Sequence, residues 1–160
     1  MVRWLDRRSW KRSARAKALA ERVQELTAFL GEQLEKLPRN PDFKGTLTHH
    51  DSCSALREMK VTGPVRLLIG HCLPNAVFTE LSEPEACCGF GGTFAVKQAD
   101  VSGAMVKDKT DALRATGAAR VISQDCGCLM NIGGALEKQQ RQLAPRHIAE
   151  FLWERTGGDE

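Results

Sequence analysis

Two adjacent cysteines followed by a glycine-rich turn constrain this chain more than any other stretch, which reads Cys87-Cys88-Gly89-Phe90-Gly91-Gly92. Neighbouring side chains on a strand point to opposite faces, so two thiols serve one site only where the backbone bends sharply. Gly89, Gly91 and Gly92 supply that bend, because glycine adopts a positive φ at no steric cost and lets a bulky group approach the backbone. The stretch therefore indicates the floor of an inorganic site, although two buried thiols beside a turn would give the same pattern.

The chain length indicates a single domain, and the cysteine usage indicates that its thiols are reduced. The chain has 160 residues, enough for a single domain with its own core, and six cysteines. The sequence has no secretory apolar region and no apolar run of membrane length, so we expect a cytoplasmic protein without a transmembrane segment. Thiols stay reduced in the cytoplasm, and the cysteines therefore favour metal binding or redox chemistry over structural disulfides.

Charge is small and unevenly spread. The net charge is +3, and basic side chains crowd the first 22 residues. A basic end can contact nucleic acid or an anionic membrane, but a solvated helix face is the commoner explanation. Tyrosine is absent and aromatic residues make up 6% of the chain, which argues against a base-stacking surface. We expect no nucleic-acid partner.

Hydrophobic periodicity predicts alternating strands and helices. An apolar stripe from Leu19 to Leu37 predicts one helix over residues 9–37, which packs either on the following domain or on a partner. Further along, the pattern predicts strands over 44–50, 76–81 and 119–123, and helices over 54–59, 64–70, 101–116, 129–139 and 146–153. This alternation indicates an α/β fold with a mostly parallel sheet flanked by helices. We expect residues 156–160 to form a disordered tail.

Each of three cysteine groups follows a predicted strand. The carboxyl ends of parallel strands meet at one edge of a sheet, where sites form in open α/β folds. The candidate metal ligands brought to that edge are Cys53, Cys87, Cys88, Cys126 and Cys128. Cys72 has no cysteine neighbour and is interpreted as a packing residue. His49 and His50 are candidate ligands or proton carriers, and the simpler interpretation is a strand-end pair with one side chain inward and one outward.

The cysteine spacing favours an iron–sulfur cluster over zinc. Zinc sites are usually built from Cys-x-x-Cys pairs, and the chain has Cys-Cys and Cys-Gly-Cys instead. Four or five thiolates from three loops suit a cluster, and Gly89, Gly91 and Gly92 would bring backbone amides close to its sulfides. A redox dithiol at Cys126-Gly127-Cys128, just before a predicted helix, is the second interpretation. A dinucleotide loop is disfavoured, because Phe94 stands where its third glycine belongs.

Four stretches together resemble the cysteine-rich CCG domain family. They are His50-Asp51-Ser52-Cys53, then Cys87 to Phe94, then Ser102-Gly103-Ala104-Met105, then Cys128 to Gly134. The most similar members are iron–sulfur subunits of lactate-utilisation and glycolate-oxidase systems, and one of the subunits of heterodisulfide reductase is more distant. Members usually carry two such domains in tandem, and this chain resembles the second. We expect an N-terminal helix and linker over 1–43 and the CCG domain over 44–155.

The resemblance implies a cofactor, ligands and partners. The cofactor would be a [4Fe–4S]-type cluster, non-cubane in heterodisulfide reductase, held at Cys53, Cys87, Cys88 and Cys128. Asp125 stands where the family has the first cysteine of a Cys-x-x-Cys, and Cys126 is the candidate substitute. The partners would be other redox subunits of a lactate or glycolate oxidation complex, a first-half CCG domain, or a second copy of the chain. The alternative to electron transfer is an assembly domain with a labile, substituted or absent metal.

Overall fold

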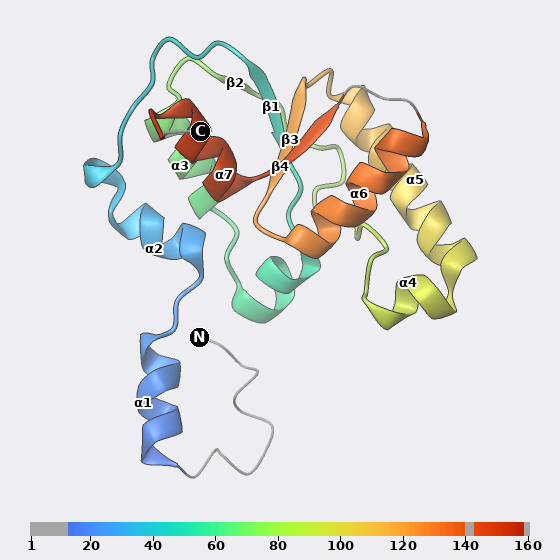
Figure 1. The fold of residues 1–160 in the computed structure, drawn as a ribbon, viewed down its shortest axis with the longest axis horizontal. Coiled ribbons are helices and arrows are strands. Elements are labelled where there is room, and N and C mark those ends of the chain that lie inside the picture. Colours follow the sequence, from blue (N-terminus) through green and yellow to red (C-terminus); the bar gives the residue numbers. More distant parts are fainter. Residues whose placement is uncertain (1–12, 140–142, 159–160) are drawn as a thin grey trace.

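A four-stranded parallel sheet lies at the centre of the computed structural model, which describes residues 13–139 and 143–158 (Figure 1). The strands are β1 (Thr46–His49), β2 (Val77–Phe78), β3 (Arg120–Ser123) and β4 (Ala144–His147), in the order β2-β1-β3-β4. Every neighbouring pair is parallel, with Thr48 opposite Val121 and Val121 opposite Pro145. The predicted α/β fold with a parallel sheet flanked by helices is confirmed.

Helices cover both faces of the sheet (Figure 1). Helices α3 (Pro64–Cys72) and α7 (Ile148–Arg155) lie on one face, and α5 (Ala99–Ala115) and α6 (Cys126–Lys138) lie on the other. Neighbouring side chains of β3 point to opposite faces of the sheet, so β3 contributes to both hydrophobic cores. Ile122 is buried against α3 and α7, and Val121 is buried against α5 and α6. The result is a three-layer sandwich whose site-bearing edge is at the carboxyl ends of the strands.

The N-terminal segment differs from the single helix that the apolar stripe predicts. It forms α1 (Ala14–Arg22), α2 (Leu26–Glu32) and a 3-10 turn, η3 (Leu34–Lys36). The chain is extended at Val23 and Glu25, and the Glu25 carboxylate accepts a hydrogen bond from the Ala28 amide, which caps α2. The prediction of one continuous helix is therefore wrong; its residues 9–12 lie outside the described part.

The apolar stripe accordingly divides between two environments. Leu30, Leu34 and Leu37 pack against the core formed with α3 and α7. Leu19 and Val23 are exposed, and α1 has no buried residue. Of the two predicted alternatives, packing on the following domain or on a partner, the second half of the stripe shows the first, and for the first half the prediction of a partner stays open.

Several element bounds also differ from the sequence pattern. Strand β2 has only two residues, and β4, which no pattern predicted, occupies residues where the last helix was expected to begin. Pro145 lacks an amide hydrogen, which suits it to a strand with a neighbour on one side only. Helix α6 begins at Cys126, so two candidate ligands belong to its first turn. Of the tail, residues 159–160 lie outside the described part.

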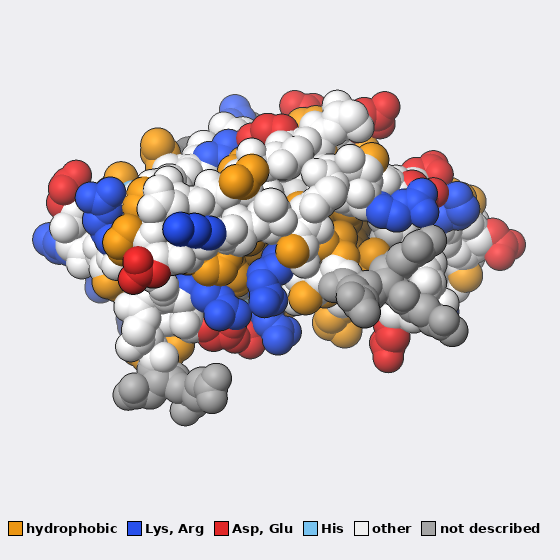
Figure 2. All heavy atoms as spheres, turned by 90° about the horizontal axis from the view of Figure 1, so that it is seen from above, with side chains coloured by type: hydrophobic (Ala, Val, Ile, Leu, Met, Phe, Trp, Pro, Cys, Tyr) orange, Lys and Arg blue, Asp and Glu red, His pale blue; other side chains and the backbone are white. Residues whose placement is uncertain are grey.

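The surface is of mixed charge. Figure 2 shows lysine and arginine side chains interspersed with acidic ones on the face seen from above, with apolar side chains between them. Within the described residues, no helix is both long enough and apolar enough to cross a membrane.

Two short elements complete the site-bearing edge. One is η4 (Ser54–Met59), a turn of π-helix that residues 50–53 connect to β1, and the other is α4 (Thr93–Lys97), which follows the glycine turn. The Ser52 hydroxyl accepts a hydrogen bond from the Ala55 amide of η4 at 3.1 Å. Single π-helical turns occur often at functional sites.

Candidate metal centre

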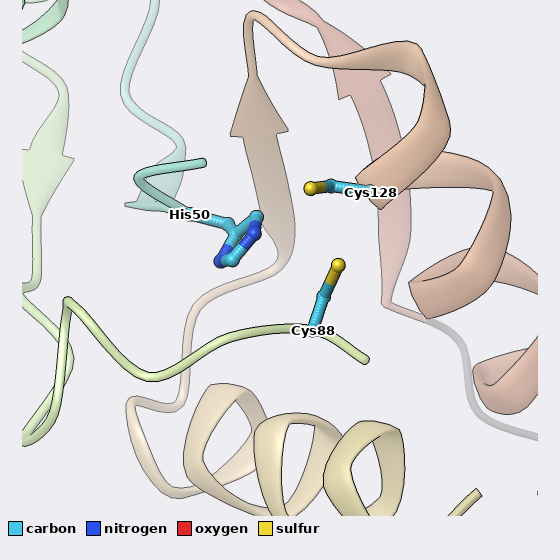
Figure 3. Close-up of side chains that lie close together, drawn as sticks. All are labelled: His50, Cys88 and Cys128. Carbon is cyan, nitrogen blue, oxygen red and sulfur yellow. The ribbon is translucent and has the colours of Figure 1, made fainter. Parts of the chain in front are cut away.

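Three buried side chains from separate segments meet beyond the ends of the central strands. His50 follows β1, Cys88 belongs to the loop after β2, and Cys128 lies in the first turn of α6. One ligand atom from each lies within 4.8 Å of the others, and Figure 3 shows the three side chains directed toward a common point. Their exposed fractions are 0%, 1% and 4%, so the arrangement excludes bulk water.

Two further candidate ligands lie beside this group. Burial raises the pKa of Cys53, and the thiols of Cys87 and Cys88 raise it further, because ionising neighbouring thiols brings like charges together. Cys53 and Cys87 are both half-buried. Cys53 and Cys87 therefore lie next to the buried group, and of the five cysteines that the strand-end argument names, Cys126 is the one placed apart.

Cys126 is placed differently from the other candidates. It is exposed at the first residue of α6, and it is not a member of the buried group of His50, Cys88 and Cys128. The Asp125 carboxylate caps the same helix by accepting a hydrogen bond from the Cys128 amide at 3.0 Å. Asp125 thus fixes the first turn that carries Cys128.

The glycine turn has the backbone that the sequence predicts. Gly89, Gly91 and Gly92 have φ values of 81°, 50° and 56°, which confirms the expected positive φ. A Cβ atom on Gly89 would lie 2.8 Å from the Ser102 carbonyl oxygen, so that position also lacks room for a side chain. The Gly89 amide lies 3.3 Å from Cys87 Sγ and donates a hydrogen bond to it. Hydrogen bonds to ligand sulfurs stabilise thiolate charge and tune redox potential.

Polar side chains hold the backbone of the cysteine pair. Ser102 on α5 donates to the Gly89 carbonyl at 2.8 Å, and Asn131 on α6 donates to the Cys88 carbonyl at 2.8 Å. Ser123 at the end of β3 donates to the His50 carbonyl at 2.9 Å. Sequence reasoning quoted Ser102 and Asn131 within motifs but gave them no role, because only the fold brings α5 and α6 against the turn.

The thiols of Cys88 and Cys128 shift each other's pKa in opposite directions. The Cys128 thiol lowers the pKa of Cys88, and the His50 ring and the Phe90 amide lower it further, against the effect of burial. The same contact with Cys88, together with burial, raises the pKa of Cys128 far above its ordinary value. Ionisation of Cys88 is therefore favoured over ionisation of Cys128. A metal bound in place of the thiol protons would make both cysteines ligands.

The surroundings of His50 fit a metal group. Both of its ring nitrogens are buried, and neither makes a hydrogen bond within the described part of the chain. A buried polar atom without a partner costs about 1–3 kcal/mol. A metal beside the two cysteines would satisfy one of these nitrogens, and thiolate with imidazole is a donor set that iron–sulfur and zinc sites both use.

His49, the preceding residue, faces a different environment. Its Nε2 lies 2.9 Å from Gln124 Oε1, and its Nδ1 lies 3.3 Å from Asp51 Oδ1. Asp51 is in turn bound by Arg66, whose Nη2 lies 2.8 Å from Asp51 Oδ2. The His49 ring and the Arg66 guanidinium hold the pKa of Asp51 well below its usual range, although burial acts in the opposite direction. His49 thus belongs to a polar network that supports the strand end.

Comparison with known proteins identifies the family. A family model described as a cysteine-rich domain, CCG, matches residues 47–133. The chain belongs to the CCG cysteine-rich domain family. The match runs from β1 into α6 and includes all the buried ligand candidates of this CCG domain.

Curated relatives carry one recurring description. "Lactate utilization protein A" of Bacillus pumilus is 39% identical over 140 residues, covering 88% of this chain and 58% of the relative. The protein of that name from Bacillus cytotoxicus is 39% identical over 146 residues, covering 91% of this chain and 61% of the relative. The protein from Bacillus thuringiensis is 37% identical over 146 residues, with the same coverage. The chain thus spans about three fifths of the length of these relatives.

Proposed function

We propose that this chain is an iron–sulfur electron-transfer domain of a system that oxidises lactate or a related 2-hydroxy acid. It would act in the cytoplasm with other redox subunits and need not contain the site that oxidises the substrate. The description of the relatives as lactate utilization proteins supports the system. The observation that carries the chemistry is the buried group of His50, Cys88 and Cys128 at the strand edge, with Cys53 and Cys87 half-buried beside it.

Each residue of the edge has a definite role in this proposal. Cys53, Cys87, Cys88 and Cys128 would hold a [4Fe–4S]-type cluster as thiolates, and His50 would stand as a further donor beside them. Such a cluster supplies one-electron transfer when bound. In that state the amide of Gly89 would stabilise negative charge on Cys87, and the N-terminus of α6 would stabilise it on Cys128.

An assembly domain without a stable metal is the competing function. Two features favour metal binding over it: within the described residues the buried ring of His50 has no hydrogen-bond partner, and the buried thiols of Cys88 and Cys128 lie beside that ring. A bound metal would satisfy these groups. A structural thiol pair would need neither feature.

Iron content after anaerobic reconstitution tests the proposal on one matched pair of variants. Cys128→Ser and Cys126→Ser change the same atom on the same helix turn, but Cys128 is buried in the group and Cys126 is exposed. We expect Cys128→Ser to lower bound iron and visible absorption at least about tenfold, in line with the loss of a ligand. Cys126→Ser should keep both near the wild-type level.

Other outcomes have clear meanings. Colourless wild-type protein without bound iron after reconstitution would contradict the proposed function and favour the assembly domain. Equal iron loss in both variants would restore Cys126 as a ligand. Unchanged iron in any two of Cys53→Ser, Cys87→Ser, Cys88→Ser and Cys128→Ser would contradict the proposed ligand set.

A further inference from the structure

Lys109 on α5 is a buried lysine close to the candidate metal centre. Its side chain is only 2% exposed. Lysine is almost never fully buried unless it is paired, because removing an ammonium group from water costs several kcal/mol. The buried position of Lys109 therefore requires a negative charge nearby or a functional reason for the residue.

The described residues offer little compensation from carboxylates. Lys109 Nζ donates a hydrogen bond to the Glu83 carbonyl at 3.1 Å, which accounts for one of its three N–H donors. Among the ion pairs formed within residues 13–139 and 143–158, none involves Lys109. Lys107, two residues earlier, is 67% exposed and pairs with Asp111 at 2.9 Å. The buried ammonium thus lacks the ion pair that its exposed neighbour has.

Lys109 adjoins the turn that carries the cysteine pair. Lys109 and Cys87 line the same open cleft, which has a volume of about 480 Å³ and also borders Glu83 and Ala86. Burial lowers the pKa of Lys109, and the charges of Cys88 and Cys87 oppose that effect more strongly than those of Glu83 and Asp51. Negative charge on the ligand cysteines would therefore favour the ammonium form of Lys109 more than the two carboxylates do.

Helix α5 presents Lys109 on the face that holds the cysteine turn. Ser102, Val106 and Lys109 are buried on α5 at spacings of four and three, which places them on one side of the helix. Ser102 binds the Gly89 carbonyl on that side. One helix face thus anchors the turn with a hydroxyl and adds a cation about two turns further along.

We propose that Lys109 is the fixed counter-charge of the metal centre, offsetting the charge of the cysteine ligands and raising the reduction potential of the bound cluster. The proposal rests on the proposed function, because it needs a cluster at this site. Adding an electron to a cluster increases its negative charge. A cation held nearby in a medium of low dielectric stabilises the reduced form more than the oxidised form.

Potentiometric titration of the reconstituted full chain tests this role. Lys109→Met removes the charge at similar length, Lys109→Arg keeps the charge, and Lys107→Met removes an exposed charge from the same helix. Dithionite is the reductant, and visible absorption with iron content reports the cluster. We expect Lys109→Met to lower the equilibrium constant for one-electron reduction about tenfold, which is a fall of about 59 mV in midpoint potential. Lys109→Arg and Lys107→Met should change the constant less than about threefold.

Every other outcome of this titration either supports or overturns the counter-charge role of Lys109. Lys109→Met with normal iron and an unchanged potential overturns the proposal while the proposed function stands. Wild-type protein without iron overturns both. If Lys109→Met fails to hold iron while Lys109→Arg holds it, the charge is needed for assembly and the counter-charge role is supported. If both variants fail, the shape of the side chain matters rather than its charge, and the proposal is wrong.

Discussion

His49 and His50 are neighbours in the chain with opposite surroundings. The His49 ring is hydrogen-bonded to Gln124 through Nε2, and its Nδ1 lies 3.3 Å from an oxygen of Asp51. The His50 ring faces the cysteines, and neither of its nitrogens is hydrogen-bonded in the described residues. Successive side chains at a strand end point to opposite sides of the sheet. His49 therefore supports the strand end, whereas His50, one residue later, belongs to the candidate site. The sequence suggested one inward and one outward ring. Both are buried, because the outward side is covered by the Asp51 and Arg66 network.

Ser102 gives a residue-scale prediction that needs no metal. Its hydroxyl donates to the Gly89 carbonyl at 2.8 Å, and it is 4% exposed. Ser102→Ala leaves a buried carbonyl without this donor, so we expect the free energy of unfolding of the metal-free protein to fall by about 1–3 kcal/mol. Urea denaturation followed by circular dichroism measures the change.

The matched control for this change is Ser82→Ala, since Ser82 is exposed. Its effect should stay within about 0.5 kcal/mol. Equal effects of the two substitutions would mean that the bond from Ser102 does not hold the cysteine turn.

At the scale of elements, the strand ends were predictable and the links between them were not. The alternation of strands with helices is enough to place Cys53 and Cys128 at one edge. The loop that carries Cys87 and Cys88 follows the two-residue strand β2, which ends at Phe78, so periodicity could not fix the path of that loop. Strand β4 escaped prediction because Pro145 is untypical of strands and fits only at the edge position that the fold gives it.

Arg66 on α3 is one of the links that only the fold reveals. Its guanidinium binds Asp51 after β1 and Glu80 after β2, with Nη2 at 2.8 Å from an oxygen of each. It also lies over the Phe78 ring, 5.8 Å from the centroid. A single side chain therefore fastens two strand ends that are 29 residues apart in the chain, from residue 51 to residue 80.

Glu80 makes this link dependent on pH. Its hydrogen bond with Arg66 lowers the pKa of Glu80 below its ordinary value. A carboxyl group with a lowered pKa in the folded state contributes stability above its unfolded pKa, about 4.3, and loses it as pH falls through the folded value. We expect Glu80→Gln to be less stable than wild type by up to about 1 kcal/mol at pH 7, since Glu80 is 50% exposed. The difference should disappear at lower pH.

Unfolding curves across a pH series measure this difference, and Glu85→Gln is the control. Glu85 is an acidic residue of the same loop region, and within the described part of the chain it forms no ion pair. Glu85→Gln should match wild type throughout the series. A Glu80→Gln deficit that persists unchanged below the carboxyl pKa range would contradict an electrostatic origin.

At the scale of the whole molecule, the N-terminal segment is only partly integrated with the CCG domain. Helix α2 packs against α3, whereas α1 lies away from the sandwich in Figure 1 and leaves Leu19 54% exposed. The stripe gave correct apolar positions but wrong continuity, since the helical period alone does not reveal the extended residues from Val23 to Glu25. We still predict that self-association covers the exposed part, which light scattering can measure.

Leucine truncation on the two halves of the stripe tests this division in the full chain. Leu34 packs against the core between α3 and α7, so Leu34→Ala should lower the free energy of unfolding by about 2 kcal/mol or more. Leu19→Ala removes the same atoms from an exposed site and should change it by less than about 0.5 kcal/mol at low protein concentration. Chemical denaturation at two protein concentrations provides the measurement. If Leu19→Ala becomes costly only at the higher concentration, α1 packs in an assembly. A large cost at both concentrations would mean instead that α1 folds onto its own domain.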